Sequence, residues 1–256
     1  MTKPVLLIRA DGNQDDAQAL TELGIDSVID PYIRIDRTPD AADAQHLLSQ
    51  LSKPGNKWLI ATSVNAIRCF EELVGPEALR AAIAASVDLR FAAVGERTAQ
   101  ALRQIGADEV LTPERSDSAA LATMLAELGQ SEPALGTPTA IIPSGLLAMK
   151  TLPNKLETTG WNLIQGVVYT TITVETEPET AAAARACEFG AVIFRSPSAA
   201  RAFLSFVPNP QMPLIAAGFT TAKVIQDAGL AVASIPSNPT PKSVAAAVSE
   251  ILKGDR

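Results

Sequence analysis

Short, continuous apolar runs alternate along the chain with longer stretches in which apolar residues recur at helical spacing. Continuous runs are typical of parallel strands that helices cover on both faces, whereas half-exposed strands alternate polar and apolar residues. The pattern therefore predicts an α/β protein built on parallel sheets. The runs are VLLI (5–8), SVID (27–30), WLIAT (58–62), FAAVG (91–95), EVLTP (109–113), TAIIP (139–143), VVYTT (167–171), AVIFR (191–195), LIAAG (214–218) and AVASIP (231–236).

Part of this pattern occurs twice in the chain. Residues 58–71 (WLIATSVNAIRCFE) have the layout of residues 191–204 (AVIFRSPSAARAFL), and residues 91–106 have the layout of residues 214–229. In residues 91–106 and in residues 214–229, a glycine is followed by a threonine three residues later and by a closing glycine after a further eight. A shared origin explains this spacing better than chance, so we expect two lobes of one fold that face each other.

The outer parts of the repeat interleave with the inner parts. Residues 5–24 and residues 140–160 share the order of short strand, polar turn, helix and glycine, and each precedes one of the inner parts. Two assemblies are compatible with this order. Either each outer part joins the inner part that follows it, or the chain crosses from one lobe to the other and back.

Two extended segments favour the crossed assembly. PYIRIDR (31–37) and VVYTTITVE (167–175) are rich in β-branched residues and similar in length, so we expect them to pair as a two-stranded antiparallel β-ladder between the lobes. A ladder of two strands would let the lobes open and close. The predicted lobes are residues 1–35 with 173–256, built from both chain ends, and residues 36–172 in the middle.

Local signals mark several helix ends. Ser116 and Ser118 precede an apolar-periodic stretch and are expected to cap it, as is the segment Pro241-Lys242-Ser243 before the final stretch. Four glycines stand where a helix is expected to end in a left-handed residue: Gly24, Gly106, Gly160 and Gly229.

Composition supports a soluble protein with ordinary cores. The chain has 256 residues, 47% of them hydrophobic, which suits two domains. The apolar run Val5–Ile8 is too short for a signal-peptide core, and no run approaches the length of a membrane span, so we expect a cytoplasmic protein. A net charge of −7 without a Lys/Arg cluster argues against nucleic acid as a partner.

The scarcity of histidine and cysteine excludes several chemistries. His46 is the single histidine, and Cys69 and Cys187 stand alone, so histidine-based triads and histidine-ligated metals lack their residues. Neither a G-x-G-x-x-G motif nor a P-loop occurs, which leaves nucleotide cofactors without support. We therefore expect neither a metal nor a cofactor.

The repeated turns are the candidate binding site. Ligands of open α/β sheets lie at the carboxyl ends of the strands, where helix N-termini offer N–H donors to anions. Hydroxyls, glycines and backbone donors follow four strands in this way, although such residues also serve as simple helix caps, an alternative that the pattern leaves open. The candidates are Ser63, Val64, Asn65, Gly95, Thr98, Ser196, Pro197, Ser198, Gly218, Thr220 and Thr221.

Tyrosine and arginine add two further candidates. Tyr32 and Tyr169 both lie in the expected ladder, and a phenol can donate a hydrogen bond to a leaving oxygen while staying neutral at pH 7. The alternative is an aromatic side chain that only packs there. Arg9 ends the first strand, where it can meet a carboxylate or form an ordinary surface pair.

Taken together, these residues resemble the uroporphyrinogen-III synthase family, cofactor-free enzymes of tetrapyrrole biosynthesis. The resemblance covers nearly the whole chain, and it lies in the order and spacing of its motifs. The motifs are VLLIRA (5–10), TSVNAIRCF (62–70), VGERTAQAL (94–102), VVYTT (167–171), RSPSAARAF (195–203) and AGFTTAKVI (217–225). It implies two flavodoxin-like, doubly wound lobes joined by the two-stranded ladder. Separately, we expect a monomer, because the sequence shows no exposed heptad pattern and no unpaired apolar strand.

The resemblance also implies a reaction. The family converts hydroxymethylbilane, an open-chain tetrapyrrole with eight carboxylates, by expelling its terminal hydroxyl as water and closing the macrocycle through a spiro intermediate with ring D inverted. Free bilane closes to the uninverted isomer, so the enzyme must hold one folded geometry. Tyr169 matches the family tyrosine that contacts the departing hydroxyl. Ser63, Thr98, Ser196 and Thr221 match positions around the substrate.

Two positions depart from the family pattern. Arg195 stands where a small or hydroxylated residue is more common, so it either offers a charge contact or points away. Ser144 stands where an arginine commonly follows the strand, which weakens any ionic clamp in the middle lobe. A second hypothesis, from the duplicated lobes and the missing acid–base pair, is a two-lobed module that binds a small anion or sugar without chemistry.

Overall fold

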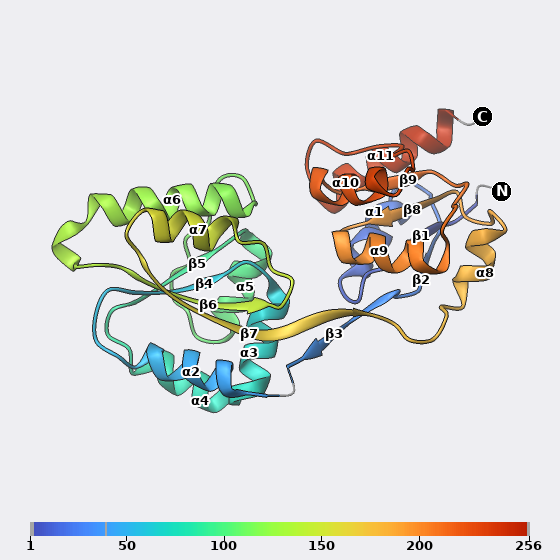
Figure 1. Cartoon of the computed structure of the whole chain (residues 1–256). Helices are drawn as coiled ribbons and strands as arrows, with labels where there is room; N and C mark the ends of the chain where they lie inside the picture. The colour runs from blue at the N-terminus through green and yellow to red at the C-terminus, as the bar shows by residue number, and fades with distance from the viewer. Residues whose placement is uncertain (1–2, 39, 255–256) are drawn as a thin grey trace. The chain divides into compact units, whose positions relative to one another are not determined.

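The computed structural model describes residues 3–38 and 40–254 and is an α/β protein with parallel sheets. The chain forms two compact units. One consists of Met1–Ile35 and Thr171–Arg256 and is called the end unit, and the other consists of Asp36–Thr170 and is called the middle unit. The chain thus leaves the end unit once and returns to it once, as the colours of Figure 1 show.

The end unit is built on a four-stranded sheet of order β2-β1-β8-β9, in which every neighbouring pair is parallel. Its strands are β1 (Val5–Leu7), β2 (Ser27–Ile29), β8 (Ala191–Phe194) and β9 (Leu214–Ala216). Its helices are α1 (Asn13–Thr21), α8 (Thr180–Arg185), α9 (Pro197–Phe206), α10 (Phe219–Asp227) and α11 (Pro241–Gly254).

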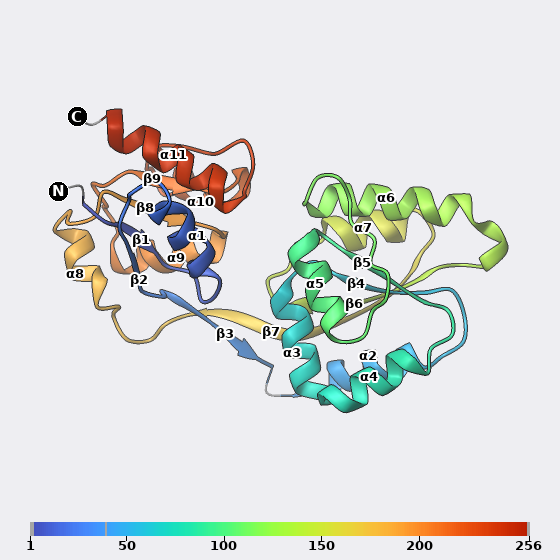
Figure 2. The ribbon, with the colours of Figure 1, turned by 180° about the vertical axis from the view of Figure 1, so that it is seen from behind.

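Helices cover both faces of this sheet, because alternate strand residues point to opposite sides. Leu6 and Val192 share one buried cluster with residues of α8, α9 and α10. Leu7 and Ile193 share another cluster with residues of α1 and α11, and these two helices lie side by side in Figure 2. The continuous apolar runs of β1 and β8 follow from this burial on two faces.

The middle unit is built on a sheet of order β3-β7-β6-β4-β5, in which β7, β6, β4 and β5 are mutually parallel. The strands are β3 (Ile33–Arg37), β4 (Lys57–Ala61), β5 (Leu89–Ala93), β6 (Thr139–Gly145) and β7 (Asn162–Thr173). The helices are α2 (Ala42–Leu51), α3 (Val64–Val74), α4 (Pro76–Ala84), α5 (Glu96–Gln104), α6 (Ser118–Ser131) and α7 (Thr151–Thr158), with a 3-10 turn at Pro133–Leu135.

This sheet is also covered on two faces. Trp58 and Ile142 pack with residues of α6 and α7 in one buried cluster, and Figure 1 shows α2 and α4 on the opposite side. Strands β3 and β7 both cross the boundary between the units. The Thr38 N–H donates to the Val168 carbonyl (3.2 Å), and the Val174 N–H donates to the Tyr32 carbonyl (3.1 Å).

Most local expectations hold, with three corrections. The four helix-ending glycines all have positive φ, between 69° at Gly24 and 111° at Gly106. The cap of α6 is Asp117, whose carboxylate accepts from the Ala120 N–H (2.8 Å), and neither Ser116 nor Ser118. At the start of α11 the Thr240 hydroxyl accepts from the Ser243 N–H, so the cap lies one residue before the predicted segment.

The third correction concerns two predicted strands. The runs 109–113 and 231–236 form only single parallel bridges, Ala92 to Leu111 and Ile215 to Ser234. Both runs are broken by proline or polar residues and lie at sheet edges, where fewer backbone partners hold them.

Candidate functional site

The two serine turns have the same local structure in the two units. Ser63 precedes α3 with an extended backbone, and its hydroxyl accepts from the Asn65 N–H (3.1 Å). Ser196 precedes α9 in the same conformation, and its hydroxyl accepts from the Ala199 N–H (3.2 Å) and contacts the Ser198 hydroxyl (3.0 Å). Each serine is therefore a helix N-cap at the carboxyl end of a central strand. Val64 and Pro197 begin the two helices.

The glycine turns also repeat. Gly95 and Gly218 are extended N-caps of α5 and α10, and their carbonyls accept from the N–H groups of Thr98 (3.0 Å) and Thr221 (3.1 Å). The side chains of both threonines are buried, whereas Thr220 is exposed. Hydroxyls at the two buried positions pack within their own units, which the sequence pattern did not reveal.

The surroundings of the two glycines differ. A methyl group placed on Gly95 would lie 2.6 Å from the Ser116 Oγ, so the segment before α6 lies against this turn. A methyl group on Gly218 would meet no atom within 4 Å. The glycine turn of the end unit is therefore open and that of the middle unit is covered.

Tyr169 lies beside the carboxyl ends of two strands of the middle unit, β6 and β4. It belongs to β7, and its hydroxyl donates to the Ser63 Oγ (3.4 Å) after β4. Gly145 ends β6, and a methyl group there would lie 2.7 Å from the Tyr169 Cζ, so only a glycine admits the ring. The Leu146 N–H donates to the Tyr169 carbonyl (2.9 Å). A half-buried phenol is thus held next to a hydroxyl-capped helix N-terminus.

Tyr32 has a different setting. Its side chain is fully buried and packs against Phe203 in a tilted arrangement and against Phe206 edge to face, with ring centroids 5.2 Å and 5.9 Å away. Its hydroxyl shares a hydrogen bond of 3.1 Å with the Thr180 hydroxyl. Burial raises the pKa of this phenol above its ordinary value, and the hydrogen bond to Thr180 acts in the opposite direction. Tyr32 is a core residue of the end unit.

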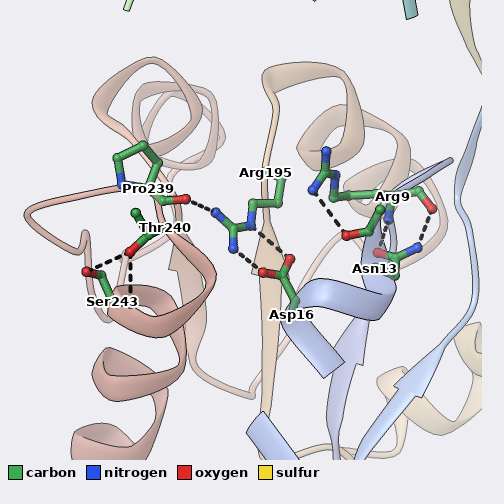
Figure 3. A network of polar contacts seen from close by, with 8 residues as sticks. Arg9, Asn13, Asp16, Arg195, Pro239, Thr240 and Ser243 are labelled. Carbon is green, nitrogen blue, oxygen red and sulfur yellow. Dashed lines mark hydrogen bonds and ion pairs between the residues drawn. The ribbon is translucent and has the colours of Figure 1, made fainter. Parts of the chain in front are cut away.

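Arg9 follows β1 in the end unit and belongs to a turn held by side-chain amides. Its guanidinium donates to the Gly12 carbonyl (3.4 Å). The buried Asn13 side chain accepts from the Arg9 N–H (3.2 Å) and donates to the Arg9 carbonyl (2.8 Å), as Figure 3 shows. The turn into α1 is therefore rigid without a hydroxyl cap.

Arg195, which departs from the family pattern, forms a buried ion pair. Its Nε–H donates to the Asp16 Oδ2 (2.9 Å) and a second nitrogen donates to the Asp16 Oδ1. The remaining terminal nitrogen donates to the Pro239 carbonyl (Figure 3). The guanidinium is thus turned toward α1 and the segment before α11. No feature of the sequence marked Asp16 as its partner.

Among residues 3–38 and 40–254, no group of three or more His, Cys, Asp or Glu side chains is arranged to hold a metal ion. Cys69 is buried in α3, where desolvation raises the pKa of its thiol, and it is a small core residue as predicted. Within the same described part of the chain, no helix combines the length and apolarity needed to cross a bilayer.

Glycine, serine and threonine turns at the carboxyl ends of parallel strands define an open-sheet α/β protein. The family model described as uroporphyrinogen-III synthase HemD matches residues 14–246. The chain therefore belongs to the uroporphyrinogen-III synthase family, as the sequence resemblance predicted.

Individual relatives agree with this assignment. A porphyrin biosynthesis protein HemD from Ruminiclostridium josui is 30% identical over 119 residues, which are 46% of this chain and only 23% of that protein. A uroporphyrinogen-III synthetase from Helicobacter pylori has a TM-score of 0.64 at 18% identity, with 100% of both chains covered. A mutant uroporphyrinogen III synthase from Thermus thermophilus has a TM-score of 0.62 at 16% identity, with 98% and 99% covered.

The two solved structures support the fold. The alternative hypothesis of a binding module without chemistry finds no support in any of these comparisons.

Proposed function

We propose that this chain is a uroporphyrinogen-III synthase, a cofactor-independent lyase that dehydrates hydroxymethylbilane and closes it to uroporphyrinogen III with ring D inverted. One observation carries the proposal beyond family membership. Tyr169, the only tyrosine outside the buried core, lies within hydrogen-bonding distance of Ser63 (3.4 Å) at the carboxyl ends of the strands of the middle unit.

The finer architecture that we propose is two flavodoxin-like, doubly wound lobes joined by a two-stranded antiparallel ladder. The sheet order β2-β1-β8-β9, extended by the bridge to Ser234, corresponds to the flavodoxin order 2-1-3-4-5. The order β7-β6-β4-β5, extended by the bridge to Leu111, gives the same order if β6 and β7 are counted first. The hydrogen bonds from Thr38 and Val174 support opposite directions for β3 and β7.

The proposed lobes are residues 1–35 with 173–256 and residues 36–172, and the two compact units support this division. In each lobe the point where the strand order reverses lies between the first and third strands of the flavodoxin order, which is where ligands of such sheets bind. Arg9 and Ser196 follow these two strands in the end unit, and Gly145 and Ser63 do so in the middle unit.

We propose that the turns of both units bind the substrate carboxylates through hydroxyls and helix N-termini, which suits a polyanion even in a protein of net charge −7. The glycine turn at Gly218, where a methyl group would meet no atom within 4 Å, leaves room for close approach of such a group. The proposed binding residues are Arg9, Ser63, Val64, Asn65, Gly95, Thr98, Ser196, Pro197, Ser198, Gly218, Thr220 and Thr221. Buried Thr98 and Thr221 act in this proposal by shaping their turns.

Tyr169 is the proposed catalytic residue. Its phenol donates a hydrogen bond to the terminal hydroxyl of the bilane and so helps the C–O bond to break, with the hydroxyl leaving as water. Ser63 accepts from the phenol before substrate binds and thereby holds it in one orientation. The cation left on the bilane bonds to the substituted α-carbon of ring D, which gives the spiro intermediate. The original bond from that carbon to its methylene carbon then breaks, and the methylene carbon bonds to the free α-carbon of ring D, which loses a proton. This proton balances the one that the leaving hydroxyl takes up, and the bound geometry directs closure to the inverted isomer.

We further propose that the enzyme works as a cytoplasmic monomer with a small-molecule substrate, without a nucleic-acid or membrane partner and without a metal. The family reaction is redox-neutral and needs neither an electron carrier nor a group donor. A single histidine and an acidic net charge support the same picture.

The product isomer tests the proposal. The protein is mixed with freshly prepared hydroxymethylbilane, the products are oxidised to porphyrins, and the I and III isomers are separated by chromatography. With the protein, isomer III is expected to be the main product. In a protein-free control, hydroxymethylbilane closes to isomer I. Isomer I alone, at the rate of the control, would exclude this function.

A further inference from the structure

The pair Arg195–Asp16 is the most deeply buried ion pair among the described pairs of the chain. The side chains of Arg195 and Asp16 are only 9% and 2% exposed, whereas both partners of every other described pair are at least 25% exposed. The pair is bidentate, and the same guanidinium also holds the Pro239 carbonyl (Figure 3). Two charges so deeply buried carry a desolvation cost, which an apolar pair would avoid.

The fold itself does not require this pair. The repeat of the middle unit has Thr62 at the position of Arg195, directly before the capping serine, and it forms the same strand, serine turn and helix. The pair is therefore an addition to one lobe. It joins three segments: the first turn of α1, the residue before Ser196, and the loop that leads into α11.

The position of Asp16 near the Ser196 turn makes its charge important for any carboxylate bound there. Asp16 puts a carboxylate in the first turn of α1, at the positive end of a helix where an anion would otherwise be favoured. An unpaired carboxylate beside the turn at Ser196 would repel a substrate carboxylate, and low-dielectric surroundings would strengthen that repulsion. Arg195 cancels this charge with both of its Asp16 contacts in place.

We propose that Arg195 is a positioning residue for substrate carboxylates. It neutralises Asp16 and fixes the turn 195–198, and it does not itself bind the substrate, because its donors face Asp16 and Pro239. The inference rests on the proposed function, in which the Ser196 turn receives a carboxylate. It differs from a direct arginine–carboxylate clamp in the sign of the effect expected when Asp16 is changed.

Three variants test the proposal: Arg195→Met, Asp16→Asn and the double variant. Removal of the arginine leaves the negative charge and should raise the KM for hydroxymethylbilane about tenfold, the order expected for one unit charge roughly 10 Å from an anion at intermediate dielectric. Asp16→Asn leaves the positive charge and should lower KM several-fold. The double variant should return KM to within about twofold of the wild type, with kcat nearly unchanged throughout.

Arg185→Met is the matched control. Arg185 also bonds a carboxylate, that of Glu177, and a backbone carbonyl, that of Phe206 (3.0 Å), in the same unit, but its side chain is 43% exposed. The KM of the Arg185→Met variant should equal that of the wild type. If Arg195→Met does not fold, Arg195→Lys takes its place. This variant keeps the charge and should show a near-normal KM, and the KM of the double variant is still compared with those of Asp16→Asn and the wild type.

Three outcomes would overturn the inference. If both single variants raise KM alike, the pair is only a scaffold. If the double variant keeps the high KM of Arg195→Met, the guanidinium contacts substrate directly. If KM is the same in all variants, the pair has no part in binding.

Product analysis of the wild type separates this failure from failure of the proposed function. If no isomer III forms, the same four proteins are compared by their calorimetric Kd for benzenehexacarboxylate, which requires no turnover. If the Kd rises in Arg195→Met and falls in Asp16→Asn, the neutralising role is upheld. If the Kd shifts equally in both single variants, or if no binding is detected, that role is rejected.

Discussion

The turns that follow the first strand of the flavodoxin order differ sharply between the two units. In the end unit the turn after β1 is polar and tied down, with Asn13 closing on the backbone of Arg9 and Asp16 paired to Arg195. In the middle unit the turn after β6 is apolar and exposed, with Leu146 and Leu147 63% and 67% exposed. The serine turns beside them remain alike. The two units thus share the serine caps and differ in the turns beside them.

In our proposal this difference reflects a division of work. The end unit neutralises Asp16 with Arg195 and ties the Arg9 backbone to Asn13, which suits the proposed binding of carboxylates there. The middle unit places a phenol next to an apolar turn, and an apolar neighbour is compatible with the flat faces of pyrrole rings. In our proposal the chemistry therefore belongs to the middle unit, and the predictions that follow test this assignment from the largest expected effect to the smallest.

Tyr169→Phe should reduce turnover about 10²- to 10⁴-fold, because the phenol is the proposed donor to the leaving hydroxyl. The matched control is Tyr32→Phe, which removes a buried hydroxyl from the end unit and its bond to Thr180. This control should cost about 1 kcal/mol of unfolding free energy and leave turnover intact. Steady-state kinetics and urea unfolding of both proteins give the comparison. Equal activity in the two variants would remove Tyr169 from the mechanism.

Gly145→Ala should lower turnover about tenfold while the protein stays folded. The new methyl group would lie 2.7 Å from the Tyr169 Cζ, and the outer end of the ring can swing away, which displaces the hydroxyl. Gly254→Ala is the control from the end unit, because its methyl group would meet nothing within 4 Å and Gly254 has no part in the proposed site. A wild-type rate for Gly145→Ala would mean that the position of the phenol is not critical.

Ser63→Ala and Ser196→Ala should separate the two lobes by their kinetics. Each variant loses an N-cap and about 1 kcal/mol of stability. Ser63→Ala should lower kcat several-fold as well, because it removes the acceptor that orients Tyr169. Ser196→Ala should act mainly on KM. Identical kinetic profiles, measured at matched substrate ranges, would contradict a division between chemistry and binding.

Asp117→Asn should have the smallest effect, since asparagine caps a helix about as well as aspartate. The N–H of Ala120 lowers the pKa of the Asp117 carboxyl, with Arg115 acting in the same direction. A carboxyl with a lowered folded-state pKa stabilises the protein above its unfolded pKa, and this contribution is lost as the pH falls through the folded value. The variant should therefore lose less stability between neutral and acid pH than the wild type in urea titrations. An identical acid dependence would mean that Asp117 contributes nothing to it.

The sequence allowed the prediction of the α/β class, the parallel strands and the repeated turns, because each depends on local patterns. Ser63 and Ser196 cap their helices, and the glycine turns at Gly95 and Gly218 form the same hydrogen bonds. The side-chain roles of the proposed site residues stay predictions.

Contacts between residues far apart in the chain could not be predicted from local sequence patterns. Asp16 and Arg195 are 179 residues apart, and only the parallel pairing of β1 with β8 brings their turns together. Gly145 was not recognised for the same reason, since its role depends on Tyr169 in the adjacent strand. The buried state of Thr98 was missed because a helix residue one turn from its cap can face either the core or the ligand.

The interrupted course of the chain has a consequence for biosynthesis. Val5 on β1 pairs with Ala191 on β8, so β1 is synthesised long before this central neighbour. The middle unit, Asp36–Thr170, emerges as one uninterrupted stretch and can collapse first. Until β8 is made, β1 can pair only with β2, and its opposite edge stays open to capture by other chains.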